Sequence, residues 1–148
     1  MPVGPIRHAI VLLVSCLLVG CQDRDLTSSP KYSGVIGTEY RTKSGLYAVG
    51  VFRDIGKKEL GFIHISPVHE TGPEVAFQRP IPVGSVVKVL AVRKRFVPLE
   101  NGIEFIVALD GIDLPDGVEI VVPLYGYMQT SDGFPDSTRF ERISGLAP

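Results

Sequence analysis

After residue 31, the chain contains no long apolar segment with helical period. It consists of short runs rich in β-branched residues, separated by glycine, proline and polar residues. Such runs form strands because β-branched side chains pack well on a pleated surface, whereas Gly, Pro and Asn favour turns. We expect strands within residues 32–40, 47–54, 60–66, 85–97, 103–110, 118–127 and 138–143. The sequence therefore predicts an all-β fold, a small OB-like or SH3-like barrel or sandwich of about six or seven strands.

Two connections have the composition of hairpin turns. Residues 55–59 separate two apolar runs, and Asn101-Gly102 follows the long run 85–97. Asn-Gly is the strongest short hairpin signal, because both residues tolerate positive φ in a type I′ turn. The long run is apolar on both alternating sets of positions, which is typical of a strand that bends and changes the face it turns to the core.

The C-terminal run 138–143 fits two structures. Thr138 and Glu141 have the spacing of a capping box, which would start a helix. The same residues also suit a last strand. Gly145 and Pro148 leave little room for a helix to grow, so we favour the strand.

The N-terminus has the features of an export signal. Arg7 precedes an apolar run, Ala9–Val19, that is too short to span a membrane as a helix. The run ends in Leu18-Val19-Gly20-Cys21, an aliphatic residue at −3 and a small residue at −1 before a cysteine. This motif resembles the lipobox of bacterial lipoproteins. The resemblance implies cleavage after Gly20 and a diacylglycerol thioether on Cys21, which would become the mature N-terminus and hold the protein to a membrane.

This interpretation divides the chain into three parts. Residues 1–20 are the lipoprotein signal peptide, residues 21–30 a lipidated N-terminus and flexible tether, and residues 31–148 a single β domain. By the same resemblance, Gln22 after the lipidated cysteine favours the periplasmic face of the outer membrane over the inner membrane. Cys16 would leave with the signal, so no disulfide could form in the mature chain.

Charge and motif content exclude several function classes. The chain has 15 Lys and Arg residues and 16 Asp and Glu residues, so it lacks the net positive charge on which nucleic-acid binding depends. No Gly-x-Ser-x-Gly motif marks a nucleophile. His64, His69 and Glu70 could hold a metal, but their spacing better fits a strand side chain and a loop. We therefore predict no catalytic residue, no metal and no cofactor.

A run of acidic residues offers a second metal candidate. Asp110, Asp113 and Asp116 lie close together in the sequence, and calcium favours oxygen-rich loops. Their spacing of three differs from that of a calcium-binding EF-hand loop. Because Asp-Gly pairs are ordinary turn residues, we interpret this segment as a turn.

Residues 50–89 resemble the S-one type RNA-binding OB domain. The matching stretches are Gly50-Val51-Phe52, residues 61–66 (GFIHIS) and residues 83–89 (VGSVVKV). The resemblance implies a five-stranded barrel with one ligand-binding face, on which Phe52, Phe62 and His64 would lie. The near-neutral charge and the predicted envelope location argue against RNA as the ligand.

Four residues are candidates for contact with a partner. Phe77 lies in the proline-rich stretch 66–84, which is the best candidate for a long binding loop, with a proline-rich crossover that packs on the barrel as the alternative. Arg93 and Arg95 belong to a basic run at the end of a strand, and Phe134 lies in the connection 129–136. Each has a structural alternative, as core packing or as a solvated strand end.

The sequence supports one main function and one alternative. The main hypothesis is a non-catalytic, lipid-anchored envelope protein that binds another envelope protein or cell-wall component in an accessory or assembly role. The alternative is a periplasmic inhibitor or immunity protein that acts against a wall-degrading enzyme or toxin.

Overall fold

A computed structural model of the chain describes residues 23–96 and 102–143. These residues form nine strands and one short 3-10 helix, η1 (Gly126–Met128). Among these residues, no helix is long and apolar enough to cross a membrane. The strands are β1 (Arg24–Asp25), β2 (Glu39–Thr42), β3 (Leu46–Asp54), β4 (Glu59–Ser66), β5 (Val75–Ile81), β6 (Val86–Lys94), β7 (Ile103–Leu109), β8 (Ile120–Pro123) and β9 (Phe140–Arg142).

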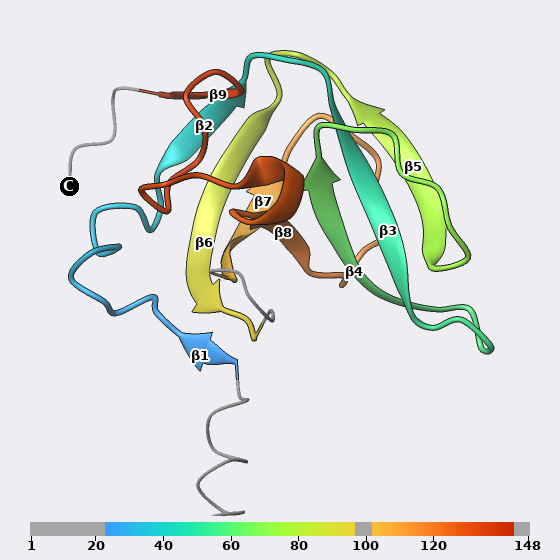
Figure 1. The fold of residues 1–148 in the computed structure, drawn as a ribbon. Coiled ribbons are helices and arrows are strands. Elements are labelled where there is room, and N and C mark those ends of the chain that lie inside the picture. Colours follow the sequence, from blue (N-terminus) through green and yellow to red (C-terminus); the bar gives the residue numbers. More distant parts are fainter. Residues whose placement is uncertain (1–22, 97–101, 144–148) are drawn as a thin grey trace, which may run out of the picture.

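All nine strands belong to one sheet, ordered β5-β3-β4-β8-β7-β6-β2-β9, with β1 added to β6 (Figure 1). Every neighbouring pair is antiparallel except β4 and β8, which run parallel. The sheet is curled but not closed, because β5 and β9 remain its two edges. The expectation of an all-β, barrel-like or sandwich-like fold is therefore confirmed.

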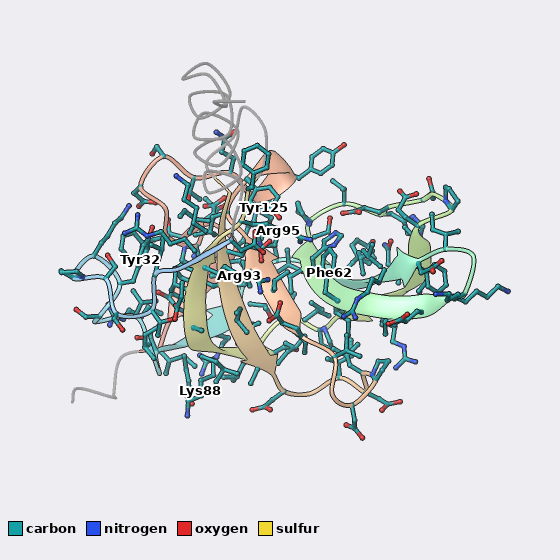
Figure 2. The ribbon with its side chains drawn as sticks, turned by 90° about the horizontal axis from the view of Figure 1, so that it is seen from below. Tyr32, Phe62, Lys88, Arg93, Arg95 and Tyr125 are labelled. Carbon is teal, nitrogen blue, oxygen red and sulfur yellow. The ribbon has the colours of Figure 1, made fainter. Side chains whose placement is uncertain are left out.

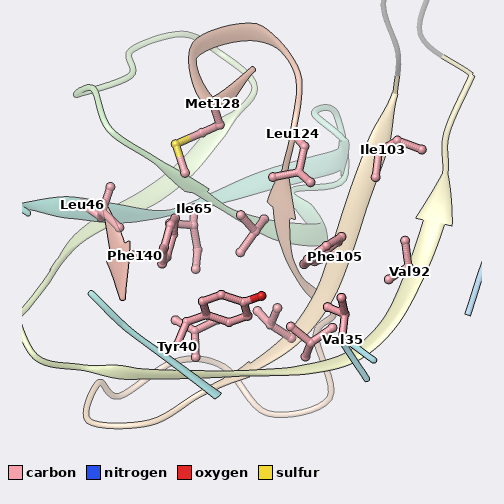
Figure 3. Packing of buried hydrophobic residues seen from close by; sticks show 14 of the residues in the cluster. Val35, Tyr40, Leu46, Ile65, Val92, Ile103, Phe105, Leu124, Met128 and Phe140 are labelled. Carbon is pink, nitrogen blue, oxygen red and sulfur yellow. The ribbon is translucent and has the colours of Figure 1, made fainter. Parts of the chain in front are cut away.

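The concave side of the curled sheet holds one apolar core (Figure 3). Leu46 from β3 and Phe140 from β9 belong to the same cluster although their strands lie near opposite ends of the sheet order. Phe105 and Ile65 fill its centre and are fully buried. One face of the sheet is apolar, and the sheet buries that face by curling around it.

A bulge in β6 explains why both of its alternating positions are apolar. The pairing with β7 shifts between Val89 and Ala91, so Leu90 is an extra residue on the bulged strand. Val87 and Val89 are buried before the bulge, and Val92 is buried after it, whereas Leu90 is half exposed. The predicted change of face within this strand is confirmed.

Three local expectations are wrong. Residues 66–84 are not a structureless loop, because β5 pairs with β3 along most of its length. The first predicted strand, 32–40, is short and late, since only Glu39–Thr42 is a strand and residues 27–37 form successive turns. The tether also differs from Asp23 onward, because β1 pairs with β6. For β5 and β1, backbone hydrogen bonds to a distant strand outweigh the local composition. Residues 27–37 instead form local turn bonds, such as those from the Tyr32 N–H to the Ser29 carbonyl and from the Val35 N–H to the Tyr32 carbonyl.

The two predicted hairpins join the expected pairs of strands. β3 and β4 form a hairpin around residues 55–58, and β6 and β7 pair antiparallel. The β6–β7 connection is longer than a two-residue turn, because the last described contact joins the Arg95 N–H to the Gly102 carbonyl. Asn101 lies outside the described residues. The C-terminal run forms strand β9 and not a helix, which confirms the favoured alternative.

Phe77, expected in a loop, instead covers a glycine in the neighbouring strand. Gly50 is opposite Phe77 in the β3–β5 ladder, and a Cβ added to Gly50 would lie 2.4 Å from a carbon of the Phe77 ring. The ring also packs under the Arg79 guanidinium at 5.3 Å. Only glycine leaves room for this ring, so Phe77 is a packing residue of β5.

We expect Gly50→Ala to lower the free energy of unfolding by about 1–3 kcal/mol, because the new methyl group meets the Phe77 ring. Urea denaturation measures the loss. Gly45→Ala is the matched control, since no atom lies within 4 Å of its added Cβ. In a Phe77→Ala background, the Gly50→Ala cost should disappear. An equal cost in both backgrounds would show that the ring is not its cause.

Candidate binding site

The face of the sheet that points away from the core cluster carries most of the polar and aromatic candidates. Directly opposite residues in neighbouring strands share a face. The ladder places Val49, His64, Val121 and Ile106 in one row across β3, β4, β8 and β7. Residues two positions along a strand lie on the same side. Phe62, Glu104 and Arg93 therefore join this face, which lies opposite the core cluster.

An apolar pocket of about 280 Å³ opens on this face where β4 ends. Phe62 and Ile65 come from β4, and Tyr125 and Met128 come from the segment around η1. Tyr127 stands at the rim with 72% of its surface exposed, the highest value among the exposed large hydrophobic residues of the described chain. The remaining lining residues are His64, Ser66, Pro67, Glu70, Pro123 and Gly126.

One side of this pocket is polar. His64 Nε2 lies 2.9 Å from Glu70 Oε1, and both side chains are mostly buried. Burial raises the pKa of Glu70, but hydrogen bonds from His64 and Ser66 outweigh it and hold that pKa below its ordinary value. Glu70 is positioned in turn by its own backbone N–H, which donates to Gln78 Oε1 of β5 at 2.9 Å. Strand β5 thus holds the polar side of the pocket in place.

A second pocket of about 370 Å³ adjoins the first and shares Phe62 with it. We call it the arginine pocket. Figure 2 views the molecule from the end at which β1 lies and shows Phe62, Arg93 and Arg95 together there. The Arg95 guanidinium lies over the Phe62 ring at 4.9 Å, which is the geometry of a cation–π contact. Its lining consists of Asp23, Phe52, Arg53, Gly61, Phe62, Arg93, Arg95 and Glu119.

A buried carboxylate stands behind the arginine pocket. Glu104 has no exposed surface, and its Oε2 accepts hydrogen bonds from Arg93 at 2.6 and 3.2 Å. Its Oε1 accepts one from the Tyr125 hydroxyl at 2.9 Å and lies 3.4 Å from Arg95. Arg93 also reaches Glu119 at 2.7 Å. This network joins β6, β7 and the segment after β8.

The network changes the ionisation of two of its members. Burial and the negative charge of Glu104 raise the pKa of Tyr125 to about 12. Burial alone would lower the pKa of Arg93, but its hydrogen bonds to Glu104 and Glu119 and their charges raise it above its ordinary value. At neutral pH the tyrosine is therefore protonated and donates a hydrogen bond to Glu104, and the arginine is charged. These states suit a fixed scaffold rather than a proton-transfer site.

The structure brings together only some of the residues singled out in the sequence. Arg93 and Arg95 line the arginine pocket. Phe77 packs on β3, as described above. Phe134 packs on the Tyr32 ring at 5.7 Å and is partly buried against the core. Cys21 lies outside the described residues.

The resemblance to the OB domain singled out Phe52, Phe62 and His64. Phe62 and His64 are neighbours with ring centroids 6.0 Å apart, and Phe52 and Phe62 both line the arginine pocket. The two metal candidates are not assembled: among residues 23–96 and 102–143, no three His, Cys, Asp or Glu side chains are grouped as metal ligands. His69 instead packs edge-on against Tyr47.

Local sequence gave no indication that four further residues would line the two pockets or stand behind them. Glu104 occurs in an apolar run, where alternation of one charged residue with apolar neighbours is an ordinary solvent-facing pattern. Tyr125 and Tyr127 occupy alternating positions in the sequence, but their place beside β4 depends on the parallel β4–β8 pairing. Asp23 joins the site only because β1 pairs with β6.

Comparison with known proteins adds no assignment: no family model matches the chain, and neither a curated protein nor a solved structure matches it.

Proposed function

We propose that this chain is a lipid-anchored envelope protein whose β domain binds another envelope component. The anchor is supported by the lipobox-like motif Leu18-Val19-Gly20-Cys21 after a short apolar run. Gln22 favours the periplasmic face of the outer membrane. Two or more acyl chains on Cys21 would hold the domain stably at that surface. The function is binding alone, and no reaction is assigned to the domain.

The observation that carries the binding proposal is the apolar pocket beside Tyr127. Its walls combine Phe62, Tyr125 and Met128, and Met128 is at the same time part of the buried core. One wall of the pocket is therefore anchored in the core of the domain. An exposed aromatic residue next to an apolar depression is typical of binding hot spots in protein interfaces.

The size and edge of the pocket indicate what enters it. A volume of about 280 Å³ is at the low end for small-molecule sites and suits one large apolar side chain. The His64–Glu70 pair at its side offers polar groups to the backbone that carries such a side chain. We assign the pocket to an apolar anchor residue of a partner protein in the envelope.

The anchor is tested by Cys21→Ser. The parent protein should incorporate labelled palmitate and fractionate with membranes, and the variant should do neither. Labelling and membrane association that survive the substitution would remove the lipid anchor from the proposal.

The pocket is tested by site-specific photocrosslinking in intact cells. A photoreactive phenylalanine at Tyr127 should give a discrete adduct, and the same group at Val83, which is also exposed, should not. With the photoreactive group placed at Pro67 on the pocket wall, Tyr127→Ser should reduce the adduct about tenfold, whereas Val83→Ser should leave it unchanged. An adduct with a wall-degrading enzyme or toxin whose activity falls would identify an inhibitor instead.

A further inference from the structure

The arginine pocket lies next to the point where the chain would leave for its lipid. Asp23 lines the pocket, and its Oδ1 accepts a hydrogen bond from the Phe96 N–H at 3.3 Å. Arg24 and Asp25 then pair with Lys94 and Arg93 of β6. The chain is thus held against the domain from Asp23 onward, and Asp23 is itself part of the pocket wall.

Chain length alone limits how far the lipid can be. Only Gln22 separates Asp23 from Cys21, so an extended chain spans at most about 7 Å between these two residues. If Cys21 carries acyl chains, as proposed above, the glycerol attached to it lies at the membrane surface. The arginine pocket then lies at the level of the phospholipid headgroups. This inference rests on the proposed anchor.

The pocket contains cations that still have donors to offer. Arg93 is engaged on both sides by Glu104 and Glu119. Arg53 contacts Glu59 at 3.4 Å, and Arg95 contacts Glu104 at 3.4 Å. A guanidinium has five N–H donors, so these contacts leave most donors of Arg53 and Arg95 for a ligand. Stacking on Phe62 keeps the Arg95 guanidinium in place over the pocket.

The charges of the pocket are balanced and not simply basic. Three arginines line it, and the carboxylates of Asp23, Glu119 and, behind them, Glu104 oppose them. A simple anion would gain from the arginines but would be repelled by the carboxylates. A ligand with a phosphate and an ammonium group a few bonds apart can pair with both. This pattern matches a zwitterionic phospholipid headgroup.

We propose that the arginine pocket binds the zwitterionic phospholipid headgroups of the membrane that holds Cys21. The phosphate oxygens accept hydrogen bonds from Arg53 and Arg95, and the ammonium group lies by the carboxylate of Asp23. The headgroups need little intrinsic affinity, because the anchor keeps them at high effective concentration beside the pocket.

This contact sets the orientation of the whole domain. Phe96 is 54% exposed at the same end of the molecule and faces the bilayer together with the pocket. The apolar pocket shares Phe62 with the arginine pocket and therefore opens next to the membrane surface. The partner's anchor residue is then expected in a segment close to the bilayer.

The test uses the full lipidated chain in bilayer nanodiscs of phosphatidylethanolamine and phosphatidylcholine that contain a spin-labelled headgroup. Amide signals of Phe62, Arg95 and Phe96 should broaden, and those of Arg41 and Glu141 should not. Combining Arg53→Gln with Arg95→Gln should reduce the broadening to the level seen around Arg41, with the protein still in the membrane. Arg41→Gln is the control, because Arg41 forms an exposed ion pair with Glu141 that is comparable to the Arg53–Glu59 pair.

A second measurement reads the pocket independently of the anchor. Glycerophosphoethanolamine, the soluble headgroup, should shift the Phe62 and Arg95 signals, and the double substitution should weaken its binding at least about tenfold. Equal shifts with inorganic phosphate, stronger binding to phosphatidylglycerol bilayers, or uniform broadening over the domain would overturn the proposal. Mass spectrometry of Cys21 detects failure of the anchor separately, as the absence of the added lipid mass.

Discussion

Glu104→Ala should lower the free energy of unfolding by about 3–5 kcal/mol, because it removes a fully buried carboxylate from a network of charged and polar partners. Arg93 would keep only Glu119, and the Tyr125 hydroxyl would lose the acceptor at 2.9 Å. The substitution also leaves a cavity between the sheet and the segment around η1. Denaturation in urea at neutral pH gives the loss directly.

Two further variants separate charge from volume in this prediction. Glu104→Gln keeps the size of the side chain, so a large part of the loss should remain if the negative charge matters. Glu59→Ala removes an exposed carboxylate that contacts Arg53 at 3.4 Å, and we expect a loss below about 1 kcal/mol. A Glu104→Ala loss as small as that control would mean that the network contributes little to folding.

Phe105→Ala should cost about 3–5 kcal/mol of unfolding free energy, since Phe105 is fully buried at the centre of the core. Its ring meets Tyr32 edge-on, with centroids 6.0 Å apart, so the loss should spread to the turns of residues 27–37. Faster proteolysis of this segment in the variant would report the effect. Phe96→Ala, at an exposed aromatic residue, is the control and should be nearly neutral.

Preserved resistance of residues 27–37 to proteolysis in Phe105→Ala would contradict this coupling. The segment would then be held by its backbone contacts alone, such as the hydrogen bond from the Gly37 N–H to the Val89 carbonyl at 2.8 Å. Comparison of the two Phe variants at equal denaturant concentration distinguishes local from global loss.

The candidate site was partly visible in the sequence. Arg93, Arg95, Phe62 and His64 attract attention by residue type, and the alternation of β4 places Phe62 and His64 on one side. Nothing in their local sequence shows that Tyr125 and Asp23 lie beside them. Asp23 reaches the pocket through the pairing of β1 with β6, across about seventy residues of chain.

Composition and alternation determined the β class, most strand positions and the change of face within β6, because these depend on contacts within a few residues. Only the tertiary structure decided that β5 is a strand, that Phe77 covers Gly50, and that Glu104 is buried under two arginines. Strand order, the parallel β4–β8 pairing and the attachment of β1 depend on hydrogen bonds between distant segments, which no local pattern encodes. Both pockets are formed by those pairings.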